Sequence, residues 1–318
     1  MAQPANTFDS YDQVGIREDL SDVIHNISPE ETPFYTACVK TSAENTYAEH
    51  QTEALRASAD NKHIEGDDTT ASAVTPTTRL GNYTQIFKNA VITTGTDKGL
   101  KKAGRGREMA RQIVKAAKEQ KLDIEKALFA NNARVAGNST TARELAGAPA
   151  WLISNVDFVS ASSGANPTGD GTDARTDSGA PTAFTQTKFN SVMQSIWTSG
   201  GKPDVCYLSS FQMNVAQGFT GNNAQRATIG AEQNKVVDFM SVYVTPWGTV
   251  KFVPTRENRS RDVFIMQSDM WAVPTLRATK TEALAKTGDN DKRQVVTELT
   301  LHCLNEAASG IVADNSTS

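Results

Sequence analysis

Residues 284–308 read LAKTGDNDKRQVVTELTLHCLNEAA, and this stretch decides between a reaction site and the end of a structural sheet. Lys286–Asp289 suggests a phosphate loop, but a Walker loop requires Gly-x-x-x-x-Gly-Lys-Ser/Thr between a strand and a helix. Here the glycine follows the lysine, and a strand-like run follows the glycine. Gly288 and its neighbours therefore predict a turn, and residues 295–303 predict a strand whose side chains alternate between two faces.

The alternation also separates two residues that suggest a catalytic pair, His302 and Cys303. Neighbours in a strand point to opposite faces, so these two side chains cannot act together as nucleophile and base. Cys303 shares its expected face with Val295, Leu299 and Leu301, where a buried structural thiol is the usual role. The other histidines, cysteines and carboxylates show no metal-ligand spacing and no catalytic motif. We predict no catalytic residue, no metal site, no cofactor and hence no enzyme.

Composition limits the class of protein. The 318 residues are only 38% hydrophobic and 7% aromatic, which predicts a thin or divided core with part of the stability supplied by neighbouring copies. The net charge of -4 disfavours a dedicated nucleic-acid binder. Cys38, Cys206 and Cys303 are too few and too widely spaced for a disulfide framework or a zinc site. No signal-peptide pattern and no apolar run of membrane-spanning length is present, so no membrane partner is expected.

The most unusual region lies between Thr46 and Thr94. Residues 56–79 are rich in Ala, Asp and Thr with almost no large apolar side chain, whereas residues 82–94, NYTQIFKNAVITT, give a strong strand signal. The pattern predicts a long two-stranded excursion with a polar tip, whose limbs of roughly 20 residues reach up to ~65 Å. A lone ribbon is marginally stable in water. We therefore expect it to rest on another copy of the chain.

Residues 105–131 predict the clearest helix, and basic residues cluster on and before it. Its apolar stripe, at steps of three and four, consists of Met109, Ile113, Ala117, Ile124 and Leu128. The basic cluster is either a solvated helix face or a surface that lies near a polyanion, and the absence of interleaved aromatic residues argues against base stacking. The candidate polyanion-facing residues are Lys98, Lys101, Lys102, Arg105, Arg107, Arg111, Lys115 and Lys118.

The remaining segments predict mixed helices and strands. In residues 27–40, ISPEETPFYTACVK, Ser28 is expected to cap a short helix whose extent Pro33 limits. Residues 160–183, rich in Gly, Ser, Asp and Thr, predict a long exposed loop or an insertion. Residues 185–219 predict helix, strand and helix, and the chain then turns to strands with a hairpin turn at Pro246-Trp247-Gly248. The fold class is therefore α+β.

This order of arm, extended loop, long helix, α/β unit and returning strands resembles the major capsid proteins of tailed bacteriophages, which have the Hong Kong 97 type fold. Residues 27–40 resemble the P-x-x-TPF stretch of one podovirus and siphovirus capsid family. The segment from Leu284 resembles the closing segment of that family, Leu-Ala-Lys-Thr-Gly-Asp followed by a strand and Asn-Glu-x-Ala. The resemblance covers roughly residues 20–312, and the loop 160–183 has no counterpart.

The resemblance implies a division of the chain into five parts. They are an N-terminal arm with a short helix (1–45), an extended loop (46–94), a peripheral domain with the spine helix 105–131 (95–183), an axial domain (184–253), and a return to the peripheral domain with C-terminal strands (254–318). The extended loop would lie over a neighbouring subunit, and the spine helix would turn its basic residues toward packaged DNA. Some relatives join subunits covalently, and Lys62 near the loop tip is a candidate donor by position alone.

The implied function is structural. Many copies, as pentamers and hexamers, would assemble in the host bacterial cytoplasm into an icosahedral head enclosing double-stranded DNA, which they contact weakly and non-specifically. Scaffold, portal and decoration proteins are further partners that this function allows. The alternatives are an encapsulin-like compartment or tail component, an enzyme that uses Cys206 or a carboxylate, and a monomeric adhesive module. Particles filled with DNA rather than protein would separate the first alternative from the capsid.

Overall fold

The computed structural model describes residues 30–53, 55–68, 71, 73–100, 107–158, 164–219 and 242–317. The helices are α1 (Pro33–Ala37), α2 (Gly95–Gly99), α3 (Glu108–Phe129), α4 (Gln186–Thr198) and α5 (Ser210–Gln217), with 3-10 turns η1 (Ala148–Ala150), η2 (Ser268–Met270) and η3 (Glu306–Ala308). The strands are β1 (Val39–Ser42), β2 (Tyr47–Thr52), β3 (Thr78–Tyr83), β4 (Gln85–Thr94), β5 (Val156–Asp157), β6 (Val205–Leu208), β7 (Val242–Thr245), β8 (Gly248–Pro254), β9 (Val263–Met266), β10 (Trp271–Ala283), β11 (Asn290–Leu299), β12 (His302–Cys303) and β13 (Gly310–Val312).

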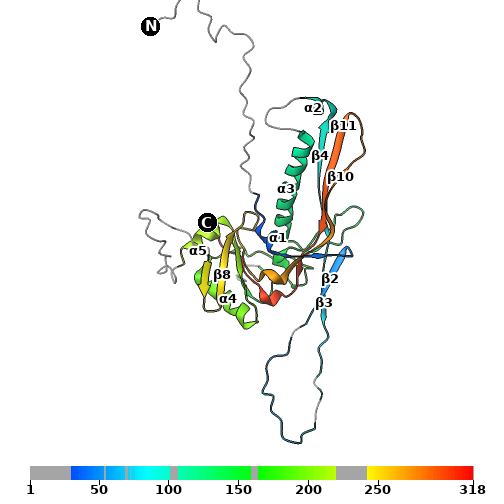
Figure 1. Cartoon of the computed structure of the whole chain (residues 1–318). Helices are drawn as coiled ribbons and strands as arrows, with labels where there is room; N and C mark the ends of the chain where they lie inside the picture. Colours follow the sequence, from blue (N-terminus) through cyan, green and yellow to red (C-terminus); the bar gives the residue numbers. More distant parts are fainter. Residues whose placement is uncertain are drawn as a thin grey trace, which may run out of the picture.

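Two sheets form the body of the described structure. The first has the order β1-β10-β11-β4, with β12 also paired to β10, and α3 lies along it (Figure 1). The second has the order β5-β13-β9-β6-β8-β7 and is covered by α4 and α5. The long strands β4, β10 and β11 carry the first sheet outward beside α3, away from the second sheet (Figure 1). This arrangement confirms the predicted α+β class.

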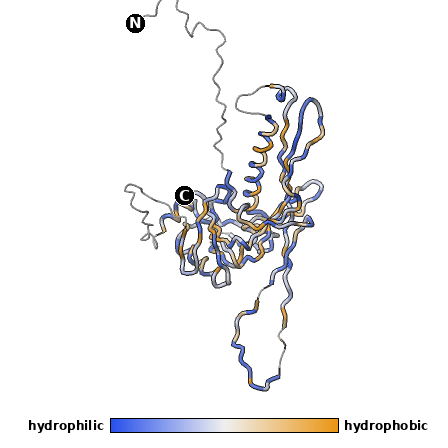
Figure 2. Tube along the Cα trace, in the orientation of Figure 1, coloured by the Kyte–Doolittle hydropathy of each residue, from blue (hydrophilic) through white to orange (hydrophobic). Residues whose placement is uncertain are grey.

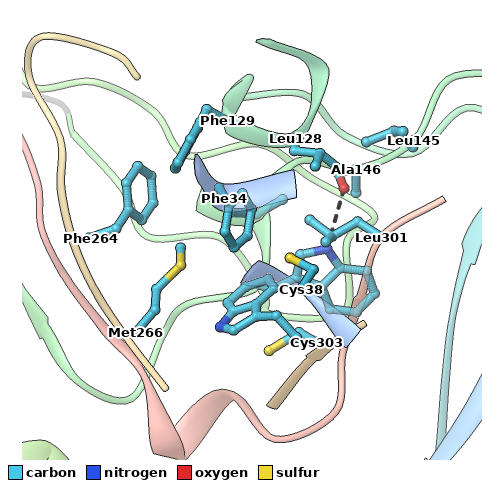
Figure 3. Close-up of a cluster of buried hydrophobic side chains, with 14 of the residues drawn as sticks. Phe34, Cys38, Leu128, Phe129, Leu145, Ala146, Phe264, Met266, Leu301 and Cys303 are labelled. Atoms are coloured by element: carbon cyan, nitrogen blue, oxygen red, sulfur yellow. Dashed lines mark hydrogen bonds between the residues drawn. The ribbon is translucent and has the colours of Figure 1, made fainter. Parts of the chain in front are cut away.

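The hydrophobic core is divided into two clusters, as the composition predicted. The larger cluster joins α1, α3 and the ends of both sheets, and Figure 3 shows Phe34, Phe129 and Phe264 gathered in it. The ring centroids of Phe34 and Phe129 are 4.8 Å apart, and those of Phe34 and Trp271 are 5.8 Å apart. The second cluster lies under α4, around Phe189. Aromatic packing at the junction therefore fixes the two sheets to each other.

The first helix begins later than the sequence predicted. Pro33 is its first residue, not a limit to its extent, and Ser28 lies outside the described residues. Thr32 precedes the helix without a side-chain cap. The helix is capped instead by Glu125 of α3. Its carboxylate accepts hydrogen bonds from the backbone N–H groups of Phe34 at 2.9 Å and Tyr35 at 2.7 Å. A residue 90 positions away thus caps α1, which no local pattern could indicate.

We expect Glu125→Ala to lower the free energy of unfolding by about 2–4 kcal/mol, because two amide groups of α1 lose their acceptor. Burial raises the pKa of Glu125, and the two N–H donors of α1 oppose that rise. Urea unfolding at neutral pH measures the loss. Glu119→Ala on the exposed side of α3 is the matched control and should change stability by less than about 0.5 kcal/mol. Equal effects of the two substitutions would contradict the capping role.

The spine helix α3 runs over Glu108–Phe129, slightly shorter than the predicted 105–131. Ile124 and Leu128 of the predicted stripe are buried, whereas Met109 and Ile113 are only half-buried. The C-terminal half of α3 packs into the larger cluster, while its N-terminal half lies beside the outer end of the first sheet (Figure 1). The predicted apolar stripe therefore corresponds to buried side chains only in the C-terminal half of the helix.

Residues 164–183 form no helix or strand and many of them are exposed, but a few of their polar side chains are buried. Arg175 is 3% exposed and donates to the Leu152 carbonyl at 2.7 Å. Asp177 is paired with Arg259, and Arg261 is paired with the fully buried Asp314 at 2.8 Å. Polar composition predicted solvent contact here, but these groups form ion pairs and a hydrogen bond at buried and partly buried positions.

The boundary expected at residue 253 also requires correction. β9 and β13 follow that position, yet both lie in the second sheet, between β5 and β6. Val263, Ile265 and Val312 pack in the same cluster as Phe189. The returning chain therefore completes the unit that was predicted to end at residue 253, because its apolar strands fill the centre of that sheet.

Candidate assembly interface

A two-stranded ribbon projects from the body. β2 pairs with β3 in antiparallel register from Tyr47–Tyr83 to Thr52–Thr78, and the chain between them extends away from both sheets (Figure 1). The predicted ribbon ran on to Thr94, and that part was wrong. Residues 85–94 form β4, which pairs with β11 along its whole length. The return limb is therefore shorter than predicted, because the apolar strand signal belongs to the sheet.

The ribbon beyond the paired strands carries side chains that its own subunit does not cover. Leu55, Ile64 and Val74 are 97%, 82% and 86% exposed. The tip around them is mainly hydrophilic (Figure 2), and Lys62 lies there, exposed and paired with Asp60 at 2.6 Å. Large apolar groups this far from the core gain nothing by folding of the monomer. They are suited to contact with a second surface.

The base of the ribbon, in contrast, is fixed to the body. The fully buried Asn82 donates to the carbonyls of Ala146 at 3.1 Å and Leu301 at 2.9 Å. Thr84 donates to the Glu298 carboxylate at 2.8 Å, and Thr300 donates to the Tyr83 carbonyl at 2.8 Å. The base of the ribbon is therefore fixed to the body, while the described residues of its outer part extend away from the body (Figure 1).

Two histidines also join the ribbon to the body. His50 of β2 and His302 of β12 have ring centroids 4.8 Å apart, and the Nε2 atom of His302 lies 3.1 Å from the Ala48 carbonyl oxygen. Burial lowers the pKa of His302 to about 4, and the neighbouring charge of His50 adds to the effect. Cys303 is buried in the core, and burial raises the pKa of its thiol. His302 and Cys303 thus serve separate contacts, as the alternation predicted.

The histidine contact predicts a dependence of stability on pH. The pKa of His302 is about 4 in the folded protein against an ordinary value of 6.5, so protons bind preferentially to the unfolded chain as the pH falls from 6.5 to 4. This contribution destabilises the fold by about 2 kcal/mol at pH 4.5. We expect His302→Gln to remove this destabilisation. When the pH is lowered from 7.5 to 4.5, the free energy of unfolding of the variant should therefore rise by about 2 kcal/mol relative to that of the wild type.

Urea unfolding of both proteins at the two pH values measures this difference. Burial raises the pKa of Asp262 to about 6, which shifts stability in the opposite direction, but that contribution is common to both proteins and cancels. His63→Gln, at an exposed position on the ribbon, is the control and should show no such change. If the difference in free energy of unfolding between His302→Gln and wild type were the same at both pH values, the histidine contact would be excluded as a source of acid sensitivity.

Four of the predicted polyanion-facing residues are paired with acidic side chains. Lys101, Lys102 and Arg105 lie outside those residues. Of the others, Arg107 is exposed at the start of α3, and Lys98 and Arg107 line one cavity of about 400 Å³. The ion pairs are Lys98–Asp291 at 2.9 Å, Arg111–Glu108 at 2.6 Å, Lys115–Glu119 at 3.5 Å and Lys118–Glu30 at 2.6 Å. These acidic partners reduce the net positive charge of the face.

Two other kinds of site are absent from the described residues. None of their helices combines the length and the apolar character needed to cross a membrane. In the same residues, no group of three or more His, Cys, Asp or Glu side chains is placed to hold a metal ion. Cys38, Cys206 and Cys303 are all free and buried.

Comparison with known proteins agrees with the architecture. The SU10 major capsid protein family matches residues 3–316. The major capsid protein of Escherichia phage Phieco32 is 28% identical over 348 residues, covering 98% of this chain and 97% of the relative.

Solved structures show the same fold at low sequence identity. The capsid of Cyanophage A-1(L) gives a TM-score of 0.65 at 12% identity over 94% of this chain and 97% of the other. The capsid of Cyanophage P-SCSP1u gives 0.59 at 12% identity over 98% and 100%. The structure of the major capsid and decoration proteins of Phage G gives 0.52 at 11% identity over 99% and 100%.

These matches favour the capsid over the encapsulin-like and tail-component alternatives. The solved structures also agree with the overall fold described above. The chain belongs to the SU10 major capsid protein family and is a structural protein of a phage capsid shell with the Hong Kong 97 type fold.

Proposed function

We propose that this chain assembles, as pentamers and hexamers of itself, into the icosahedral head that encloses the packaged double-stranded DNA of a tailed phage. The observation that carries the proposal is the ribbon, which is fixed at Asn82 and exposes Leu55, Ile64 and Val74 beyond its own subunit. A ribbon whose base is fixed and whose outer apolar side chains are exposed is suited to lie across an adjacent copy of the chain. Assembly in the cytoplasm of the host bacterium is part of the same proposal.

Each ribbon contact needs to contribute only modestly. Full burial of one Leu, Ile or Val side chain stabilises an interface by about 1.5–3 kcal/mol before the costs of association are subtracted. A closed shell links many such contacts, so the assembly is far more stable than any pair. Weak single contacts also allow a misplaced subunit to leave before the shell closes.

The two sheets suggest different positions in the shell. We assign the first sheet with α3 to the peripheral domain, and the second sheet with α4 and α5 to the axial domain near the five-fold and six-fold positions. The proposed axial domain includes β9 and β13, since they are central strands of its sheet. Its boundary at residue 253 is not retained.

Contact with the packaged DNA is proposed for the basic side of α3. Arg107 is exposed, and the side chains of Lys115 and Lys118 are 57% and 50% exposed. Because acidic partners offset part of their charge, the contact would be weak and independent of sequence. Scaffold and portal proteins are proposed further partners, and decoration proteins occur in the Phage G structure.

Electron microscopy and sedimentation of the purified full chain test the proposal. We expect closed shells, or rings of five and six copies, above a threshold concentration. Phage particles carrying this chain should be filled with DNA rather than with protein. A monodisperse monomer under all salt and concentration conditions would contradict self-assembly.

A further inference from the structure

The N-terminal half of α3 presents a face that combines basic side chains with one exposed apolar side chain. Arg107, Arg111, Val114 and Lys118 follow one another at steps of four, three and four residues, so they share one side of the helix. Val114 is 58% exposed, which is unusual for a valine in a helix that also packs into the core. We call this face the basic stripe of α3.

The charges of the stripe are only partly neutralised. Arg111 is bonded to Glu108 at 2.6 Å, and Lys118 is paired with Glu30 at 2.6 Å. Arg107 is exposed and has no acidic partner among the described residues. An acidic and partly apolar segment of polypeptide would therefore complement the stripe, with its charge at Arg107 and its apolar side chains at Val114.

The chain that leads into α1 already follows the same face of α3. Glu125 lies seven residues beyond Lys118, on the continuation of the stripe, and accepts the N–H group of Phe34 at 2.9 Å. Glu30 pairs with Lys118 itself, and α1 lies beside the C-terminal part of α3 (Figure 1). From residue 34 back to residue 30, the chain thus moves about 10 Å along α3 toward its N-terminus, at ~1.5 Å per helical residue.

Continuation in this direction brings the first 29 residues of the chain onto the stripe. Arg107 lies eleven residues before Lys118, which is about 16 Å along the helix. About five residues cover this distance if they are extended and about eleven if they are helical. Residues 19–25 are then the ones that reach Arg107, and residues 26–28 are the ones that reach Val114.

The sequence at these positions has the required chemistry. Residues 1–29 contain five acidic residues against a single arginine. Asp19 and Asp22 fall within the range that reaches Arg107, and Ile27 falls within the range that reaches Val114. Duplex DNA would also suit the basic side chains, but it offers no apolar group to cover Val114. The length of the tether from Glu30, the charge and the apolar pattern thus favour the same occupant.

We propose that residues 19–29 bind along the basic stripe of α3 in their own subunit, with Asp19 and Asp22 at Arg107 and Ile27 over Val114. This contact goes beyond the proposed function, because it forms within one subunit and does not require assembly. It also bears on the proposed contact with DNA, since Arg107 and Lys118 are among the side chains assigned to that contact and the bound segment covers them.

Alkylation of a cysteine on the stripe tests the contact. The full chain carrying Val114→Cys is treated with a soluble maleimide as a dilute monomer without DNA, and the three native cysteines, being buried, give little background. Adding Asp19→Lys and Asp22→Lys should raise the rate of alkylation at least about fivefold, because like charges then meet at Arg107 and the segment leaves the stripe. Further addition of Arg107→Glu and Ala110→Glu should restore the slow rate.

The full chain carrying Lys126→Cys is the matched control. Residue 126 is an exposed position of α3 outside the stripe, so its alkylation should be equally fast with the original and the reversed segment. Circular dichroism verifies that each variant is folded.

Equal rates at position 114 with the original and the reversed segment would overturn the inference. Protection that appears only at concentrations where the chains associate would also overturn it, because the segment would then belong to a neighbouring copy. Both measurements are independent of the yield of shells, so failure of the wild-type chain to assemble counts against the proposed function alone.

Discussion

Replacing Trp271 by alanine is expected to lower the free energy of unfolding by about 3–5 kcal/mol. Trp271 is fully buried where β10 begins, at the junction of the two sheets. Its ring packs against Phe34, and its indole N–H donates to the Ser309 hydroxyl at 3.0 Å. The substitution leaves a large cavity in the cluster that joins the sheets and removes one of the two hydrogen bonds to the Ser309 hydroxyl.

Urea unfolding of the monomer measures the loss, and Trp197→Ala is the matched control. Trp197 lies on α4 and is 57% exposed, so its removal should change stability by less than about 1 kcal/mol. Equal effects of the two tryptophan substitutions would show that the junction is not the main source of stability. A large loss for Trp271 alone would support a single cooperative body.

Shortening the ribbon is expected to abolish shell formation while the subunit remains folded. Thr52 and Thr78 are paired at the end of the two strands, so an Asn-Gly turn can replace residues 53–77 and close the hairpin. Leu55, Ile64 and Val74 bury almost no surface in their own subunit. Their removal should therefore leave the thermal midpoint within a few degrees of wild type and reduce the yield of shells by at least about 100-fold.

A second variant separates length from apolar contact. Leu55→Ser, Ile64→Ser and Val74→Ser together keep the length of the ribbon and remove only its exposed apolar groups. We expect an intermediate loss of assembly, measured by sedimentation and electron microscopy, since the backbone can still lie across a neighbour. Normal shells from the shortened variant would refute the role of the ribbon as the link between subunits.

The local patterns that predicted structure correctly share a physical basis. Thr185 accepts the Lys188 N–H at the start of α4, and Ser209 accepts the Gln212 N–H at the start of α5. Gly288, with φ of 133°, lies in the turn before β11. Caps and turns of this kind depend on residues within four positions of one another, so the sequence alone specifies them.

The candidate interface was only partly predictable. The polarity of residues 56–79 indicated an element without a core of its own, and that inference led to the ribbon. Nothing in the local sequence indicated that Asn82 and His50 hold its base, because their partners lie more than 60 and 250 residues away. The course of the chain along α3 could not be predicted either, since it depends on the contacts of Glu125 and Lys118.

The sequence by itself determined the class of the fold, the long helix, the position of the turns and the presence of a segment too polar to be buried. Tertiary structure alone decided that residues 85–94 join β11 rather than the ribbon, that Arg175 is buried, and that Glu125 caps α1. The physical reason is range. Propensity and periodicity act over a few residues, whereas pairing of strands and neutralisation of buried charge depend on groups that only the folded chain brings together.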